Sequence, residues 1–150
     1  MSIGSLCNRE VVVTGRDTSI AEAARLMRRE HVGDLVVLDS DDVRHPVGLV
    51  TDRDIVVEVI AAGLDPETVT VMDVVTEPLE LATEDTDFWD ALASMRKRGV
   101  RRLPIIDDSG GLVGILTLDD ALELIGEAVD NLVSLVSREI TQEWSARSED

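Results

Sequence analysis

Two short motifs with the same polar residues at the same spacing occur in the chain, GLVTDRD at 48–54 and GILTLDD at 114–120. In each motif a threonine ends an apolar run and an aspartate follows three residues later, as in Thr51 and Asp54. A threonine hydroxyl beside the unpaired N–H groups that begin a helix stabilises a phosphate, and an aspartate accepts hydrogen bonds from a vicinal diol such as a ribose. The pattern has the chemistry to bind a nucleotide, although a helix cap with an acidic first turn gives the same spacing without a ligand.

The strands and helices that must position these motifs occur twice along the chain, in an internal sequence repeat. An offset of 68 residues aligns Asp17 with Asp85 and Ala23 with Ala91, and after a longer polar turn at 40–45 an offset of 66 aligns Gly48 with Gly114. Hydrophobic periodicity predicts the order strand, helix, strand, strand, helix in each copy. The strands are expected at 11–14, 35–38, 47–51, 79–83, 103–106 and 112–117, and the helices around 20–27 and 88–95 and at 52–62 and 118–143.

That order, with a Gly-apolar-apolar-Thr-x-x-Asp motif in both copies, resembles a tandem pair of cystathionine β-synthase (CBS) domains, also called a Bateman module. The resemblance covers about residues 3–124 and implies an α/β (α+β) fold in which two repeats pack with pseudo-twofold symmetry, followed by a long C-terminal helix. It implies a stand-alone bacterial or archaeal CBS protein. The expected divisions are repeat 1 at 1–63, repeat 2 at 64–125, and a helical extension and tail at 126–150.

The resemblance also implies two clefts, each combining the motif of one repeat with strand residues of the other. The first cleft would unite Thr51, Arg53, Asp54, Pro78, Leu79, Glu80, Arg101, Arg102 and Pro104. The second, weaker cleft would unite Glu10, Val11, Val12, Gly33, Asp34, Thr117, Asp119 and Asp120.

The two clefts differ in charge, because Gly33 and Asp34 stand where the other repeat has Arg101 and Arg102. The first cleft is therefore expected to bind an adenosine nucleotide (AMP, ADP or ATP), with S-adenosylmethionine or NAD as less favoured ligands. The alternative for these arginines is a solvated basic face, and it applies more strongly to Arg96 and Arg98 on the helix.

Composition excludes several other classes of function. The chain has 150 residues and a formal charge of −17, which repels nucleic acid and anionic membranes. A single cysteine, Cys7, indicates the cytoplasm and no disulfide. His31 and His45 lack a paired nucleophile and the acidic run DSDD at 39–42 lacks the spacing of a calcium loop, so we expect no catalytic residue, no metal site and no enzyme.

The C-terminal helix carries an apolar stripe with alternating spacings of three and four residues. It consists of Leu122, Ile125, Val129, Leu132, Val136 and Ile140. Such a stripe must be buried, and a homodimer held by helices is the expected arrangement. Acidic residues flank the stripe, which argues against membrane binding. Two functions stay open: a regulatory sensor of an adenosine nucleotide that signals by conformational change, and a ligand-free module for dimerisation or for binding an unidentified protein partner.

Overall fold

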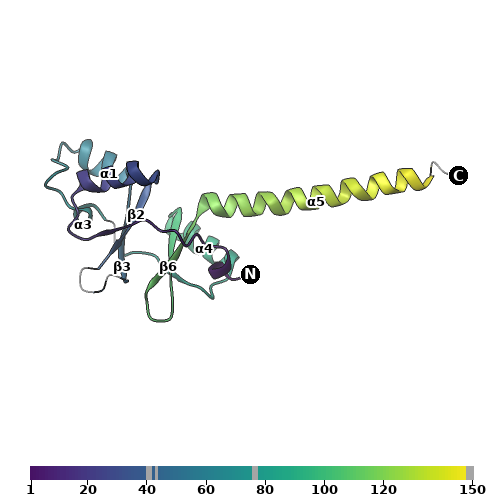
Figure 1. The fold of residues 1–150 in the computed structure, drawn as a ribbon, viewed down its shortest axis with the longest axis horizontal. Helices are drawn as coiled ribbons and strands as arrows, with labels where there is room; N and C mark the ends of the chain where they lie inside the picture. Colours follow the sequence, from purple (N-terminus) through teal and green to yellow (C-terminus); the bar gives the residue numbers. More distant parts are fainter. Residues whose placement is uncertain (40–41, 43, 76–77, 148–150) are drawn as a thin grey trace. The chain divides into compact units, whose positions relative to one another are not determined.

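The structure is a computed structural model that describes residues 1–39, 42, 44–75 and 78–147. The chain forms two compact units, Met1–Leu116 and Thr117–Asp150 (Figure 1). The first unit contains two three-stranded sheets, in the orders β1-β2-β3 and β4-β5-β6. The second contains one long helix. Mixed α/β architecture, two copies of one strand and helix order, and a long C-terminal helix confirm the predicted fold class.

The first sheet and its helix follow the periodicity of the sequence. The elements are η1 (Ile3–Ser5), β1 (Val13–Gly15), α1 (Ile20–Glu30), β2 (Asp34–Leu38) and β3 (Pro46–Thr51). Strand β1 runs parallel to β2, and β2 runs antiparallel to β3. Of the predicted apolar face of α1, Ile20, Ala23 and Met27 are buried in a core with Leu35 and Val37, whereas Ala24 is exposed. The helix begins where the Glu22 N–H donates to Ser19 Oγ at 3.2 Å, as the capping pattern indicates.

The helix after the first motif departs from the prediction. The expected helix at 52–62 is instead α2 (Asp52–Asp54) followed by η2 (Ile55–Ile60), a π-helical segment in which the Ala61 N–H donates to Val56 O at 2.9 Å. The run of β-branched residues from Ile55 to Val57 weakens α-helical preference here. A further short helix, α3 (Val71–Val74), carries no sequence period long enough to be predicted.

The second sheet repeats the first. Its elements are β4 (Ala82–Thr83), α4 (Phe88–Arg98), β5 (Arg102–Ile106) and β6 (Leu112–Thr117). Strand β4, like β1, is shorter than predicted and pairs parallel to the central strand. Gly99 ends α4 with φ of 69°, a conformation that glycine adopts without strain. The middle residues of β2 and β5 are buried on both strand faces, so these two strands form the interior of the unit.

The segment that leads into each half packs on the opposite half. The Ile3 N–H donates to Thr86 O at 2.9 Å, and the Val71 N–H donates to Thr18 O at 2.9 Å, so the same bond is made twice across the repeat. Ile3 and Val71 are both completely buried. Residues at the start of the chain thus complete the second half, and residues around Val71 complete the first.

The glycine of each motif makes room for this exchange. A Cβ atom on Gly48 would lie 2.7 Å from Val75 Cγ1, and one on Gly114 would lie 2.6 Å from Cys7 Sγ. Both distances are shorter than a carbon atom tolerates, so the crossing segment lies directly against the strand only because no side chain is there. In both copies of the motif, packing therefore explains the glycine at the start, and the hydrogen bonds of the helix cap explain the aspartate at the end.

The second unit is α5 (Leu118–Arg147), a helix of 30 residues. It extends four residues beyond the predicted end at 143. None of the described helices is long and apolar enough to cross a membrane.

Candidate ligand-binding cleft

The first motif forms a reciprocal cap at the start of α2. The Asp54 N–H donates to Thr51 Oγ1 at 3.2 Å, and the Thr51 N–H donates to Asp54 Oδ2 at 2.8 Å. Both residues are half-buried. The cap uses one carboxylate oxygen of Asp54, and among the described residues no hydrogen-bond donor reaches the other. The capping role and a role in binding a diol are therefore compatible at this residue.

The second motif has the same geometry within the second unit. The Asp120 N–H donates to Thr117 Oγ1 at 3.1 Å, and the Thr117 hydroxyl donates to Asp120 Oδ2 at 2.6 Å. The Thr117 N–H also donates to Asp120 Oδ2, at 3.2 Å. The hydroxyl proton of Thr117 is directed to the aspartate, which leaves it less able to donate to a ligand.

The arginine predicted to meet phosphate is paired with an aspartate predicted for the other cleft. Arg102 Nε donates to Asp34 Oδ2, and both side chains are mostly buried. The two residues stand 68 positions apart, at equivalent places in the repeat, where β2 and β5 begin. Equivalent positions on the central strands meet where two repeats pack with pseudo-twofold symmetry, and here their charges are opposite.

This ion pair lies beside the first motif. Asp34 is the cross-strand partner of Thr51 in the β2–β3 ladder, and the Asp52 N–H donates to Gly33 O at 2.9 Å. Gly33 and Asp34, predicted for the second cleft, therefore border Thr51 and Asp52 of the first motif. The repeat alignment contained the signal for this contact, since the offset that equates Asp34 with Arg102 equates two oppositely charged residues on central strands.

The remaining residues predicted for the first cleft differ in how firmly they are held. Glu80 Oε1 accepts from the Ser94 hydroxyl at 2.6 Å, and Glu80 Oε2 pairs with Arg98 Nε at 3.0 Å, so α4 fixes this side chain. The contact of Arg98 with Glu80 was not expected from the sequence. Leu79 is half-buried and Pro104 is buried in β5, whereas Arg53, Pro78 and Arg101 are exposed.

The residues predicted for the second cleft are divided between the two units. Val11 and Val12 are half-buried in the first unit, where Val12 O accepts from the Val36 N–H at 3.1 Å. Thr117, Asp119 and Asp120 belong to the second unit. The second cleft stays a prediction.

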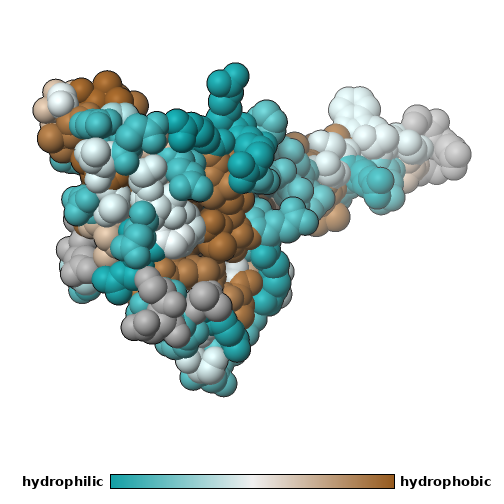
Figure 2. Space-filling view, turned by 60° about the vertical axis from the view of Figure 1, so that its left-hand side comes forward, coloured by the Kyte–Doolittle hydropathy of each residue, from teal (hydrophilic) through white to brown (hydrophobic). Residues whose placement is uncertain are grey.

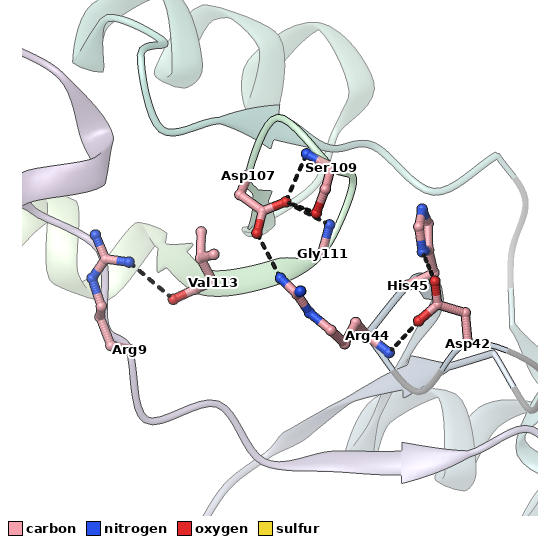
Figure 3. Close-up of polar contacts among 8 residues, drawn as sticks. All are labelled: Arg9, Asp42, Arg44, His45, Asp107, Ser109, Gly111 and Val113. Atoms are coloured by element: carbon pink, nitrogen blue, oxygen red, sulfur yellow. Dashed lines mark hydrogen bonds and ion pairs between the residues drawn. The ribbon is translucent and has the colours of Figure 1, made fainter.

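A hollow of about 230 Å³ opens at the end of β2 opposite Asp34. It is lined by Arg9, Val11, Val13, Leu38, Arg44, Leu112 and Val113. Its two guanidinium groups are already engaged. Arg44 Nη2 lies 2.7 Å from Asp107 Oδ2 (Figure 3). Arg9 Nη2 lies 2.7 Å from Glu84 Oε1. These ion pairs fasten residues of the first half to the second half, which is a structural role.

Asp107, the partner of Arg44, also accepts several hydrogen bonds from its own turn. The Ser109 hydroxyl donates to Asp107 Oδ1 at 2.6 Å, and the Gly111 N–H donates to the same oxygen at 3.0 Å (Figure 3). The Ser109 hydrogen bond, with those from the backbone and the charge of Arg44, lowers the pKa of Asp107 to about 2. The equivalent turn of the first half includes residues 40, 41 and 43, so half of the acidic run at 39–42 and part of the longer turn lie outside the described residues.

No group of three or more metal-ligating side chains comes together in residues 1–39, 42, 44–75 and 78–147. Cys7 is half-buried, and burial raises the pKa of its thiol, which disfavours the reactive thiolate.

Comparison with known proteins matches this fold to one family. The family model described as "CBS domain" matches residues 3–61 and again residues 71–127. An uncharacterized protein of Methanopyrus kandleri is 34% identical over 124 residues, which are 83% of this chain and 62% of that protein. The chain thus spans less than two thirds of that relative.

Two further proteins have both sequence and structural similarity. Hypoxic response protein 1 of Mycobacterium tuberculosis is 35% identical over 77% of this chain and 78% of its own. Its crystal structure, which has two coordinated zinc ions, gives a TM-score of 0.72 over 82% of this chain and 98% of that one. A CBS domain protein of Pyrobaculum aerophilum, solved as a complex with AMP, is 25% identical, with a TM-score of 0.73 over 80% of this chain and 89% of that one. The two repeats, their motifs and these matches together show that the chain belongs to the CBS domain family.

Proposed function

We propose that this chain is a regulatory module that binds an adenosine nucleotide in the first cleft. The observation that carries the proposal is the contact of Arg102 with Asp34, because Asp34 is the strand partner of Thr51. A cationic donor is thereby brought beside a threonine and an aspartate at the start of a helix. Phosphate and ribose need those three kinds of group.

The chemistry assigns a part of the ligand to each group. The free carboxylate oxygen of Asp54 accepts from the ribose hydroxyls, and Arg102 pairs with phosphate while the exposed Arg53 and Arg101 add positive charge. Leu79 offers apolar surface for the base. AMP in the Pyrobaculum aerophilum relative supports an adenosine ligand, with AMP, ADP and ATP ahead of S-adenosylmethionine and NAD.

Ligand binding has a built-in conformational consequence. A phosphate that pairs with Arg102 competes with the carboxylate of Asp34 for one positive charge, because the contact with Asp34 uses Nε and leaves the Nη groups to reach the phosphate. Asp34 begins β2, and Arg102 begins β5. Competition of the phosphate with Asp34 for Arg102 therefore changes the ion pair that links the two central strands. That change is the signal that a partner or a second copy of the chain reads.

The second motif is less suited to bind a phosphate than the first. Asp119 stands where the first motif has Arg53, and the Thr117 hydroxyl is committed to Asp120. Neither position offers positive charge to a phosphate.

Isothermal titration calorimetry with AMP, ADP, ATP, S-adenosylmethionine and NAD tests the proposal. We expect Asp54→Ala and Arg102→Ala each to weaken binding of the best ligand by about tenfold or more, the effect of losing one charge-assisted hydrogen bond. Asp120→Ala removes an equivalent helix cap from the other repeat and is the matched control, which we expect to change affinity little. Binding that survives Asp54→Ala and is lost in Asp120→Ala would reverse the assignment of the clefts.

The alternative is a module for dimerisation or protein interaction that binds no nucleotide. Exposed apolar side chains on helices support a homodimer under both functions: Val56 and Ile60 on η2 and Trp89 on α4 each leave more than half of their surface exposed. A thermal-shift measurement separates the two functions, because a ligand of the native state raises the melting temperature and the alternative predicts no shift. Under either function we expect no turnover of ATP, since no general base, nucleophile or metal site accompanies the motif.

A further inference from the structure

Helix α5 has an apolar face that nothing within its own unit covers. Leu132, Leu135 and Ile140 each leave more than half of their surface exposed, and so do Leu122, Val129, Val133 and Val136. Hydrophobic side chains interrupt the hydrophilic surface along this helix in Figure 2. A stable interface takes about 800 Å² from each partner, and seven large side chains along a helix of 30 residues supply a comparable area.

The spacing of this face indicates what shape of partner fits it. Leu122, Ile125 and Val129 recur eleven residues later as Val133, Val136 and Ile140. Eleven residues are close to three full α-helical turns, so the face stays on one side of a nearly straight helix. A second helix can therefore lie along it over its whole length.

The charges of α5 select both the partner and its direction. Five acidic residues and no basic ones lie between Leu118 and Asp130, while Asn131–Arg147 has two of each sign. A parallel copy would place the acidic half against an identical acidic half. An antiparallel copy places it against residues 132–144, where Arg138, Glu139 and Glu143 are the charged residues and the net charge is −1, and it also opposes the two helix dipoles. The whole chain carries −17, so a polyanionic partner such as nucleic acid is disfavoured.

We infer that α5 pairs antiparallel with α5 of a second copy of this chain. The exposed apolar face runs from Leu122 to Ile140, so the pair is centred on Asn131. In this register Leu122 meets Ile140 of the partner subunit, and Val129 meets the partner's Val133. The inference rests on the proposed homodimer and adds to it the surface and the direction.

Distances between spin labels test the direction of the pair. Thr141→Cys in a Cys7→Ser background gives one label in each copy, ten residues from the centre. An antiparallel pair separates the two labels by about 30 Å along the axis, at 1.5 Å per residue, and a parallel pair leaves them only about one helix spacing apart. Ser134→Cys, three residues from the centre, is the control because it gives a short distance in both arrangements.

Two adjacent substitutions test the surface. Val133→Asp introduces a charge into the apolar face, and we expect sedimentation equilibrium to show a monomer at micromolar concentration. Ser134→Asp makes the same charge change on the polar side and should leave the dimer intact. A short Thr141 distance overturns the direction while the homodimer stands, and a dimer that survives Val133→Asp overturns the surface. A wild-type monomer overturns the homodimer itself, whereas nucleotide binding is measured separately and is unaffected by these outcomes.

Discussion

Under the proposed function, the ion pair between Asp34 and Arg102 tunes the affinity of the first cleft for a phosphate. While the pair is intact, a phosphate competes with a carboxylate that is already hydrogen-bonded to Arg102 and mostly buried. The proposed binding is therefore weakened by the carboxylate that shares this guanidinium group.

Replacing Asp34 with asparagine should raise nucleotide affinity. Asp34→Asn removes the competing charge, and we expect the Kd for AMP, measured by calorimetry, to fall by roughly tenfold. The melting temperature without ligand should fall at the same time, because Arg102 loses its partner. Asp39→Asn, just beyond the other end of β2, makes the same change in net charge and should leave the Kd unaltered. An equal fall of the Kd in both variants would mean that the net charge of the protein, and not the ion pair of Asp34 with Arg102, controls the affinity for AMP.

At the scale of elements, the segments that lead into each half and pack on the opposite half explain why each motif begins with glycine. These segments include Cys7, which lies against Gly114, and Val75, which lies against Gly48. Gly114→Ala forces a Cβ atom against Cys7 Sγ and 3.0 Å from Asn8 O, and we expect it to destabilise the fold by about 1–3 kcal/mol. Urea unfolding measures the loss. Cys7→Ala in the same chain removes the nearer of the two atoms and should recover part of it. A Gly114→Ala protein as stable as its parent would refute the close crossing.

An element of the fold could be predicted from the sequence where its own apolar residues repeat with a regular spacing. Helices α1 and α4 follow from apolar residues three and four apart, and the central strands from runs of four apolar residues. Ile3 and Val71 lie in short segments with no period, so their burial on the opposite half comes from tertiary packing that local spacing does not encode. The capping pairs could be predicted from the spacing of threonine and aspartate. The contact of Asp34 with Arg102 could be predicted only from the alignment of the two repeats, because the two residues occupy equivalent positions and meet across the pseudo-twofold axis.

At the scale of the whole molecule, the halves are fastened by charged contacts in a strongly acidic chain. Asp107 has its pKa lowered to about 2, against about 3.9 in an unfolded chain, so it favours the folded state. This contribution is complete above about pH 4 and is lost as the pH falls toward 2. Protonation of the other acidic residues meanwhile relieves the repulsion that accompanies −17.

The substitution Asp107→Asn should therefore make the free energy of unfolding less dependent on pH at acidic pH. We expect Asp107→Asn to lower the free energy of unfolding at pH 5 and to reduce its dependence on pH between about 4 and 2. Urea titrations at several pH values measure both effects. Asp108→Asn, at the neighbouring residue, should keep the slope of the parent. An identical slope in the Asp107→Asn protein would mean that this carboxylate makes no contribution to acid sensitivity.

The exchanged lead segments also impose an order on synthesis. The first half gains the Val71 bond to Thr18 only after residue 71 has left the ribosome, although its sheet is complete at Thr51. The start of the chain, in turn, waits for Thr86 and Ile115 before Ile3 and Asn8 find their partners. Each half therefore emerges with an uncovered core and is closed by a segment that belongs to the other. A chain cut between the two repeats would therefore give two pieces that each lack the segment covering their core.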